Sequence, residues 1–130
     1  MPMSKPFHLI CAPLVAGLFA GPAAAQEFLT GEELLATIPG AVLTGISNED
    51  GKTRWVQEYH PGGRSGQASG RYDKGAYTSK WWVRCDLWCE EWGGRSGCWR
   101  IERVGESHLQ PWSGDKKLPN AWEILTAAQE

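Results

Sequence analysis

Alternating apolar and polar positions run through most of the chain after Gly40 and predict a succession of short β-strands. Within 54–60, for example, Trp55 and Tyr59 fall on one face of an extended chain, and Arg54 and Glu58 fall on the other. Turn-forming residues separate the expected strands, which are Ala41–Ile46, Arg54–His60, Ser65–Tyr72, Ala76–Val83, Asp86–Trp92, Cys98–Val104, Ser107–Trp112 and Ala121–Thr126. The last segment could instead be a helix capped at Asn120. Strands in series with short turns predict a mainly β fold, a small antiparallel meander closed into a barrel or folded as a sandwich.

A short helix is predicted just before these strands, with Leu34, Leu35 and Ile38 on one apolar face. Thr30 and Glu33 have the spacing of a capping box, in which each side chain accepts a hydrogen bond from the backbone amide of the other residue. A proline–glycine pair follows the apolar positions and ends the helix. Because a helix this short is unstable alone, we expect it to pack against the sheet.

An apolar run near the start of the chain, Leu9–Ala20, has the layout of the central part of a secretory signal peptide. Lys5 precedes this run, and the small residues Ala23–Ala25 follow it, where a signal peptidase would cut. The run is about a dozen residues long, whereas a membrane-spanning helix needs about 20. We therefore expect 1–25 to be a signal peptide and 26–130 a single β-rich domain, periplasmic or secreted, with no transmembrane segment.

The composition contributes one unusual feature, eight tryptophans in 130 residues. The formal net charge is -2, and it becomes -3 when the one positive charge of Lys5 is removed with the signal peptide. Acidic and basic residues are mixed along the chain without a basic stripe, which argues against a nucleic acid as partner. No motif indicates a cofactor or a metal, so none is expected.

Two cysteines are predicted to form a disulfide within a hairpin. If Gly93–Gly94 is a two-residue turn, Cys89 faces Cys98 with the α-carbons about 4.5 Å apart, which lies inside the disulfide range. Cys85 is about 13 Å from Cys89 along an extended strand, which is too far to bridge. With Cys11 removed in the signal peptide, Cys85 is expected to be unpaired, and either buried or a route to a covalent dimer.

A zinc site is the alternative use of these cysteines, with His108 completing the set Cys85, Cys89 and Cys98. The ligand types suit zinc, but their spacings match no common zinc motif. An oxidising compartment also favours a disulfide over metal-binding thiolates. The disulfide is therefore the preferred interpretation.

The same hairpin register brings tryptophans together on one face, with Trp88 opposite Trp99 and Trp92 opposite Arg95. One interpretation is an aromatic platform for a sugar ring or a protein, with these four as the ligand-binding residues. Trp92 would then be the most exposed ring, and Arg95 could stack on it. In the other interpretation Trp88 and Trp99 fill the barrel, and the face that carries Cys89 lies under the helix.

The pentapeptide Gly-Gly-Arg-Ser-Gly occurs at Gly62–Gly66 and again at Gly93–Gly97. Backbone amides and the arginine of each copy could bind an anion such as phosphate. The residues that flank the two copies do not match, so two hairpin turns of similar chemistry are the preferred interpretation.

The stretch from Leu29 to Trp112 resembles a family of short exported bacterial proteins of uncharacterised function. The similar features are the opening Leu-Thr-Gly-Glu-Glu-Leu, the Trp-Val and Trp-Cys pairs within Trp82–Cys89, and Cys98 further on. The resemblance implies a small antiparallel β-barrel with a cysteine pair in a hairpin, and it implies no known activity. Cys85 is an additional cysteine relative to that pattern.

No catalytic pattern is apparent in the sequence. His60 lies beside a turn and His108 lies between polar residues, and neither has a recognisable nucleophile or metal partner. Glu90 and Glu91 should point to opposite faces of a strand. We therefore expect an exported binding module for a protein or an envelope glycan, with a small periplasmic hydrolase as the alternative.

Overall fold

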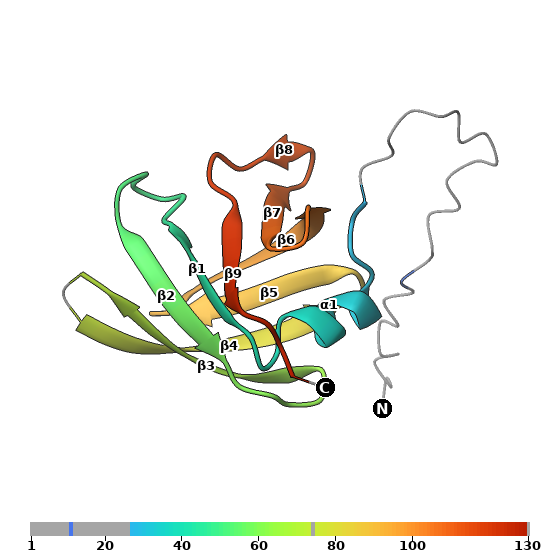
Figure 1. Cartoon of the computed structure of the whole chain (residues 1–130), viewed down its shortest axis with the longest axis horizontal. Coiled ribbons are helices and arrows are strands. Elements are labelled where there is room, and N and C mark those ends of the chain that lie inside the picture. Colours follow the sequence, from blue (N-terminus) through green and yellow to red (C-terminus); the bar gives the residue numbers. More distant parts are fainter. Residues whose placement is uncertain (1–10, 12–26, 74, 130) are drawn as a thin grey trace, which may run out of the picture.

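The structure is a computed structural model that describes residues 11, 27–73 and 75–129 of the chain. Its elements are α1 (Gly31–Thr37), β1 (Val42–Ile46), β2 (Arg54–Tyr59), β3 (Ser65–Tyr72), β4 (Gly75–Arg84), β5 (Leu87–Trp92), β6 (Arg95–Val104), β7 (His108–Ser113), β8 (Lys116–Lys117) and β9 (Trp122–Thr126). All the strands except β8 form a closed, eight-stranded antiparallel barrel (Figure 1). The fold is therefore the predicted mainly β class, and it is a barrel instead of a sandwich. Within the described residues, no helix is both long and apolar enough to cross a membrane.

The last strand, β9, closes the barrel because it pairs with both β1 and β7. Leu43 faces Ile124 across the β1–β9 pair, and Leu109 faces Trp122 across the β7–β9 pair. From β1 to β7 each strand pairs with the next one in the chain, which is the predicted meander. The segment after Asn120 is a strand and not a helix, since its apolar side chains pack against the interior of the barrel. The short β8 was not predicted, and it forms a small hairpin with the end of β7.

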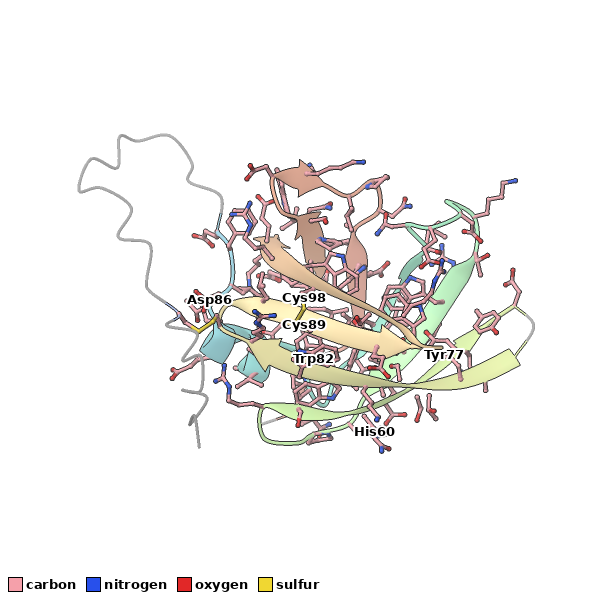
Figure 2. The ribbon with its side chains drawn as sticks, turned by 180° about the vertical axis from the view of Figure 1, so that it is seen from behind. His60, Tyr77, Trp82, Asp86, Cys89 and Cys98 are labelled. Atoms are coloured by element: carbon pink, nitrogen blue, oxygen red, sulfur yellow. A yellow bond between two sulfur atoms is a disulfide. The ribbon has the colours of Figure 1, made fainter. Side chains whose placement is uncertain are left out.

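The β5–β6 hairpin has the predicted register. Gly93 and Gly94 form its turn with φ angles of 58° and 79°, values that glycine adopts without steric cost. Trp92 consequently faces Arg95, and Cys89 faces Cys98. The two cysteines form a disulfide with their α-carbons 4.0 Å apart (Figure 2). The second copy of the Gly-Gly-Arg-Ser-Gly repeat is thus a hairpin turn, and the first copy connects the paired strands β2 and β3.

The expectation that Cys85 is unpaired is wrong for the chain that contains Cys11. These two cysteines form a second disulfide, with their α-carbons 5.1 Å apart and a sequence separation of 74. With this bond in place, the Cys85 thiol is not available for a covalent dimer or for zinc. The prediction was made for a chain processed after Ala25, which lacks Cys11, and so distant a pairing has no local sequence signal. The rest of the predicted signal peptide, 1–10 and 12–25, lies outside the described residues.

Helix α1 begins with the predicted capping box. The Thr30 hydroxyl accepts a hydrogen bond from the Glu33 amide, and the Glu33 carboxylate accepts one from the Thr30 amide. The first turn of the helix is docked on the β4–β5 turn, where the Gly31 amide donates to the Asp86 carboxylate at 2.6 Å. Leu34 and Ile38 are completely buried in the same apolar cluster as Trp88. The helix therefore packs into the barrel interior, and the prediction that it covers the Cys89 face is wrong.

The deepest part of the core is a stack of aromatic rings. Trp81 and Trp88 lie parallel with their ring centroids 5.1 Å apart, and Tyr59 meets Trp88 edge-on at 5.4 Å. All three side chains are almost fully buried. Gly66 faces Trp81 across the β3–β4 pair, and a β-carbon at Gly66 would lie 2.7 Å from the Trp81 indole. The glycine-rich strand β3 is thus shaped to receive large rings from its neighbour.

We expect Gly66→Ala to lower the free energy of unfolding by about 1–3 kcal/mol, because the new methyl group overlaps the Trp81 ring in a core without spare room. Gly63→Ala is the matched control. A β-carbon at Gly63 meets no atom within 4 Å, so this change should stay within about 0.5 kcal/mol of the parent. Urea unfolding of both variants measures the difference, and equal stabilities would contradict the packing described for β3.

We expect non-reducing peptide mapping of the chain 1–130 to recover Cys11 linked to Cys85 and Cys89 linked to Cys98. In a chain processed after Ala25, the Cys89–Cys98 bond should persist, because it depends only on the local hairpin. Replacing both Cys89 and Cys98 by alanine should cost about 2–3 kcal/mol in the chain-entropy model for so short a loop. A Cys85–Cys89 or Cys85–Cys98 peptide would refute the hairpin register.

Candidate functional site

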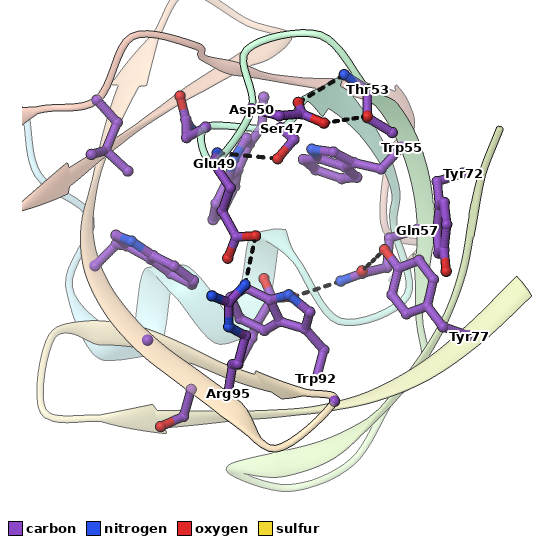
Figure 3. A pocket seen from close by; sticks show the side chains of 18 of the residues that line it. Ser47, Glu49, Asp50, Thr53, Trp55, Gln57, Tyr72, Tyr77, Trp92 and Arg95 are labelled. Carbon is purple, nitrogen blue, oxygen red and sulfur yellow. Dashed lines mark hydrogen bonds and ion pairs between the residues drawn. The ribbon is translucent and has the colours of Figure 1, made fainter. Parts of the chain in front are cut away.

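A cavity of about 840 Å³ opens at one end of the barrel. Figure 3 looks into this cavity, and α1 lies behind it at the far end of the barrel. The β1–β2 loop and the β5–β6 turn border its mouth, while side chains that point inward from the strands form its walls. The barrel is therefore packed solid near the helix and hollow at the opposite end.

Aromatic rings from several strands form most of the cavity wall. Trp122 lies between two tryptophans, and its ring centroid is 6.1 Å from that of Trp55 and 5.8 Å from that of Trp99. Trp92 continues this row at 5.9 Å from Trp99. Tyr72 and Tyr77 form a separate pair on β3 and β4, with ring centroids 5.4 Å apart. The wall thus presents ring faces from several directions to any molecule in the cavity.

Glycines behind three of these rings keep the cavity open. Trp55 lies against Gly45, Tyr77 lies against Gly70, and Trp99 lies against Gly97. A β-carbon at any of these glycines would overlap the ring in front of it. Because the rings can lie flat on the backbone, they line the wall without filling the space between the walls.

The floor of the cavity holds a buried carboxyl group, Glu90, on β5. Its side chain accepts hydrogen bonds from Gln57 Nε2 at 2.7 Å, Tyr59 Oη at 2.9 Å and Trp88 Nε1 at 2.9 Å. Gln57 Oε1 in turn accepts a hydrogen bond from Tyr77 Oη at 2.6 Å. The donors of this network come from β2, β4 and β5. The network therefore links the core to the cavity wall.

Burial raises the pKa of Glu90 above its ordinary value of 4.5, although its three hydrogen bonds act in the opposite direction. Within the described part of the chain, no lysine, arginine or histidine forms a salt bridge with this carboxyl group. Burial, and then the nearby Glu90, raise the pKa of Tyr59 well above its ordinary range and that of Tyr77 to about 12. Both tyrosines therefore stay protonated and serve as donors at neutral pH.

An ion pair joins two sides of the cavity mouth. Arg95, beside the β5–β6 turn, donates to the Glu49 carboxylate of the β1–β2 loop at 2.9 Å (Figure 3). Both side chains are more than half exposed, so the pair contributes little stability. The ion pair instead restricts access, because it spans the opening through which a molecule would reach the aromatic wall.

The β1–β2 loop is held in place by its own hydrogen bonds. Asp50 accepts from the Thr53 hydroxyl and from the backbone amides of Thr53 and Lys52. These bonds, the Thr53 hydroxyl foremost, lower the pKa of Asp50 to about 2. Asn48 exchanges hydrogen bonds with the backbone of Asn120 at 2.8 and 3.2 Å. The loop therefore presents an ionised carboxylate in a defined position at the mouth.

Three of the four predicted ligand-binding residues, Trp92, Arg95 and Trp99, line the cavity. The fourth, Trp88, is fully buried beneath it and donates to Glu90. Arg95 pairs with Glu49, whereas stacking on Trp92 was expected. The inner end of this face is thus core and its outer end is cavity wall.

Several cavity residues were not predicted from the sequence. The missed rings lie on strands outside the β5–β6 hairpin, and they are Trp55, Tyr72, Tyr77 and Trp122. Glu90 and Glu91 do point to opposite faces, as expected, since Glu90 is buried and Glu91 is exposed. A signal for Glu90 was available, because a carboxyl residue between two inward-facing tryptophans must enter the barrel.

No protein-family model, no curated protein and no solved structure matches the chain. The resemblance to a family of exported bacterial proteins therefore remains an expectation from the sequence. The class of protein that the fold defines is a small antiparallel barrel, closed at one end by a helix and open at the other to an aromatic cavity.

We expect the stability of Glu90→Gln to depend on pH differently from that of the parent. Above pH 4.5 an unfolded chain loses the Glu90 proton while the folded chain retains it, so the parent's free energy of unfolding falls as pH rises toward the folded pKa. In that window the parent should lose stability relative to the variant as pH rises, by at most about 1.4 kcal/mol per pH unit. Urea unfolding across pH measures this slope.

Glu91→Gln is the control for this experiment, because the Glu91 side chain is exposed on the same strand. The difference in free energy of unfolding between Glu91→Gln and the parent should vary much less with pH than the difference between Glu90→Gln and the parent. If the two variants show the same pH dependence, the raised pKa described for Glu90 is wrong.

Proposed function

We propose that this protein is a non-catalytic binding module that takes a small carbohydrate, such as part of an envelope glycan, into the open end of the barrel. The observation that carries this proposal is the aromatic wall around the cavity, with Trp55, Tyr77, Trp92 and Trp99 all only partly buried. Rigid rings that remain accessible within a concave site are suited to stacking against the apolar face of a sugar.

The size and polarity of the cavity support a small ligand. Its volume of about 840 Å³ lies in the range of small-molecule sites, which is about 300–1,000 Å³. Gln57, Tyr77 and Glu49 add hydrogen-bonding groups among the rings. A few polar groups in a mostly aromatic site fix the orientation of a ligand that carries many hydroxyl groups.

A disulfide supports the cellular setting of this proposal. The Cys89–Cys98 bond, which lies within the expected mature chain, fits an oxidising compartment. We infer that the protein is exported to the periplasm or secreted, where envelope glycans are available as ligands. The signal peptide at 1–25 is part of this inference.

A hydrolase is the second candidate, favoured by the raised pKa of the Glu90 carboxyl group on the cavity floor. Its oxygens, however, already accept hydrogen bonds from Gln57, Tyr59 and Trp88. A hydrolase also needs a group that works with the acid, and among the described residues no histidine and no second carboxyl group hydrogen-bonds Glu90. His60 contacts Ser69 outside the lining of the cavity, so it offers Glu90 no partner for catalysis (Figure 2).

We expect Trp92→Ala to weaken carbohydrate binding about tenfold, because one stacking surface is lost. The probes are N-acetylglucosamine oligosaccharides and disaccharide fragments of peptidoglycan, and the measurement is titration calorimetry with the intrinsic tryptophan fluorescence as a second signal. The variant should remain folded, since Trp92 is only half-buried at the mouth.

Trp82→Ala is the matched control, because Trp82 lies next to Cys89 in register on β4 and does not line this cavity (Figure 2). The affinity of Trp82→Ala for the same oligosaccharides should stay within about twofold of that of the parent. If no glycan binds the parent, or if both variants lose affinity equally, the proposal fails. Shortening of the oligosaccharides during the titration would instead support the hydrolase.

A further inference from the structure

Acidic side chains outnumber basic ones in the lining of the cavity. The lining holds three carboxyl groups, Glu49, Asp50 and Glu90, and one guanidinium group, Arg95. Arg95 is engaged by Glu49 at the rim. Asp50 at the mouth is close enough to Lys52 for the two charges to interact, whereas Glu90 on the floor has no basic partner among the described residues. The lining itself therefore holds more acidic than basic groups.

The aromatic wall also favours a positively charged ligand. The face of an indole or phenol ring carries a negative quadrupole that attracts cations, and tryptophan attracts them best. The row Trp55, Trp122, Trp99 and Trp92 and the pair Tyr72 and Tyr77 all line the cavity. Rings and carboxyl groups together make the cavity attractive to an ammonium group and unattractive to an anion.

The floor has acceptor capacity that the protein itself does not use. A carboxylate offers about four acceptor positions, and Glu90 receives three hydrogen bonds. Gln57 Oε1 receives one, from Tyr77, and has a second lone pair. An ammonium group carries donors only, so it complements these acceptors, and its positive charge favours loss of the proton from Glu90 when the ligand binds.

We propose that the natural ligand is a cationic amino sugar, with its ammonium group directed toward Glu90 and its ring stacked on the tryptophans. This inference rests on the proposed carbohydrate binding, and it adds the charge of the ligand. The groups that face Glu90 are Tyr59 and Gln57 from β2, Tyr77 from β4 and Trp88 from β5, and none of them carries a positive charge. The ligand therefore provides the counter-charge.

The test compares two disaccharides that differ only at nitrogen, the glucosamine dimer with free amines and its di-N-acetylated form. Titration calorimetry near pH 6, where the amine is protonated, should give at least about tenfold tighter binding for the free amine. Glu90→Gln should remove this preference, and Glu91→Gln, on the outer face of the same strand, should retain it.

A measurement on the unmodified protein keeps the test independent of the folding of the Glu90 variant. Affinity for the free-amine dimer should fall as sodium chloride is raised, and affinity for the acetylated dimer should not. Equal or tighter binding of the acetylated dimer would overturn the amine assignment while leaving carbohydrate binding intact. Failure of both dimers, and of longer neutral oligosaccharides, to bind would overturn the proposed function itself.

Discussion

Closure of the sheet is the constraint on which the rest of this structure depends. Once β9 joins β1 to β7, the inward side chains of every strand share one lumen, and each must either fill that space or line it. Near α1 the lumen is filled by Trp81, Trp88 and the buried face of the helix. Toward the other end, rings lie flat against glycines such as Gly45 and Gly97, and a hollow remains. The same residue types thus produce core at one end and a cavity at the other.

Glu90 connects these two regions. It accepts a hydrogen bond from Trp88 in the core, and through Gln57 it is linked to Tyr77 in the cavity wall. A buried carboxyl group with neutral partners is costly, and three donors only partly offset the lost hydration. A strand residue chosen for stability alone would be apolar at this position. Glu90 therefore lowers the stability of the barrel and is the polar group that joins the core to the cavity.

The two disulfides differ in what they depend on. Cys89–Cys98 joins residues that the hairpin already places together, so it reinforces local structure. Cys11–Cys85 connects the predicted signal peptide to the turn that receives the start of α1, where Asp86 binds the Gly31 amide. Export with cleavage after Ala25 would separate Cys11 from this turn. The state of Cys85 is consequently tied to the processing of the chain, whereas the Cys89–Cys98 bond is not.

The sequence alone determined the features that depend on neighbouring residues. The capping box of α1, the glycine turn at Gly93–Gly94 and its cysteine pair, and the shared face of Trp88 and Trp92 all follow from spacing along a few residues. Only the tertiary structure decided which face of that hairpin enters the lumen and which distant rings, such as Trp55 and Tyr77, meet it there. Periodicity records on which side of its own strand a residue lies, but it contains no information about which strands face each other across a closed barrel. The cavity exists only between strands, so it could be recognised only after the sheet had closed.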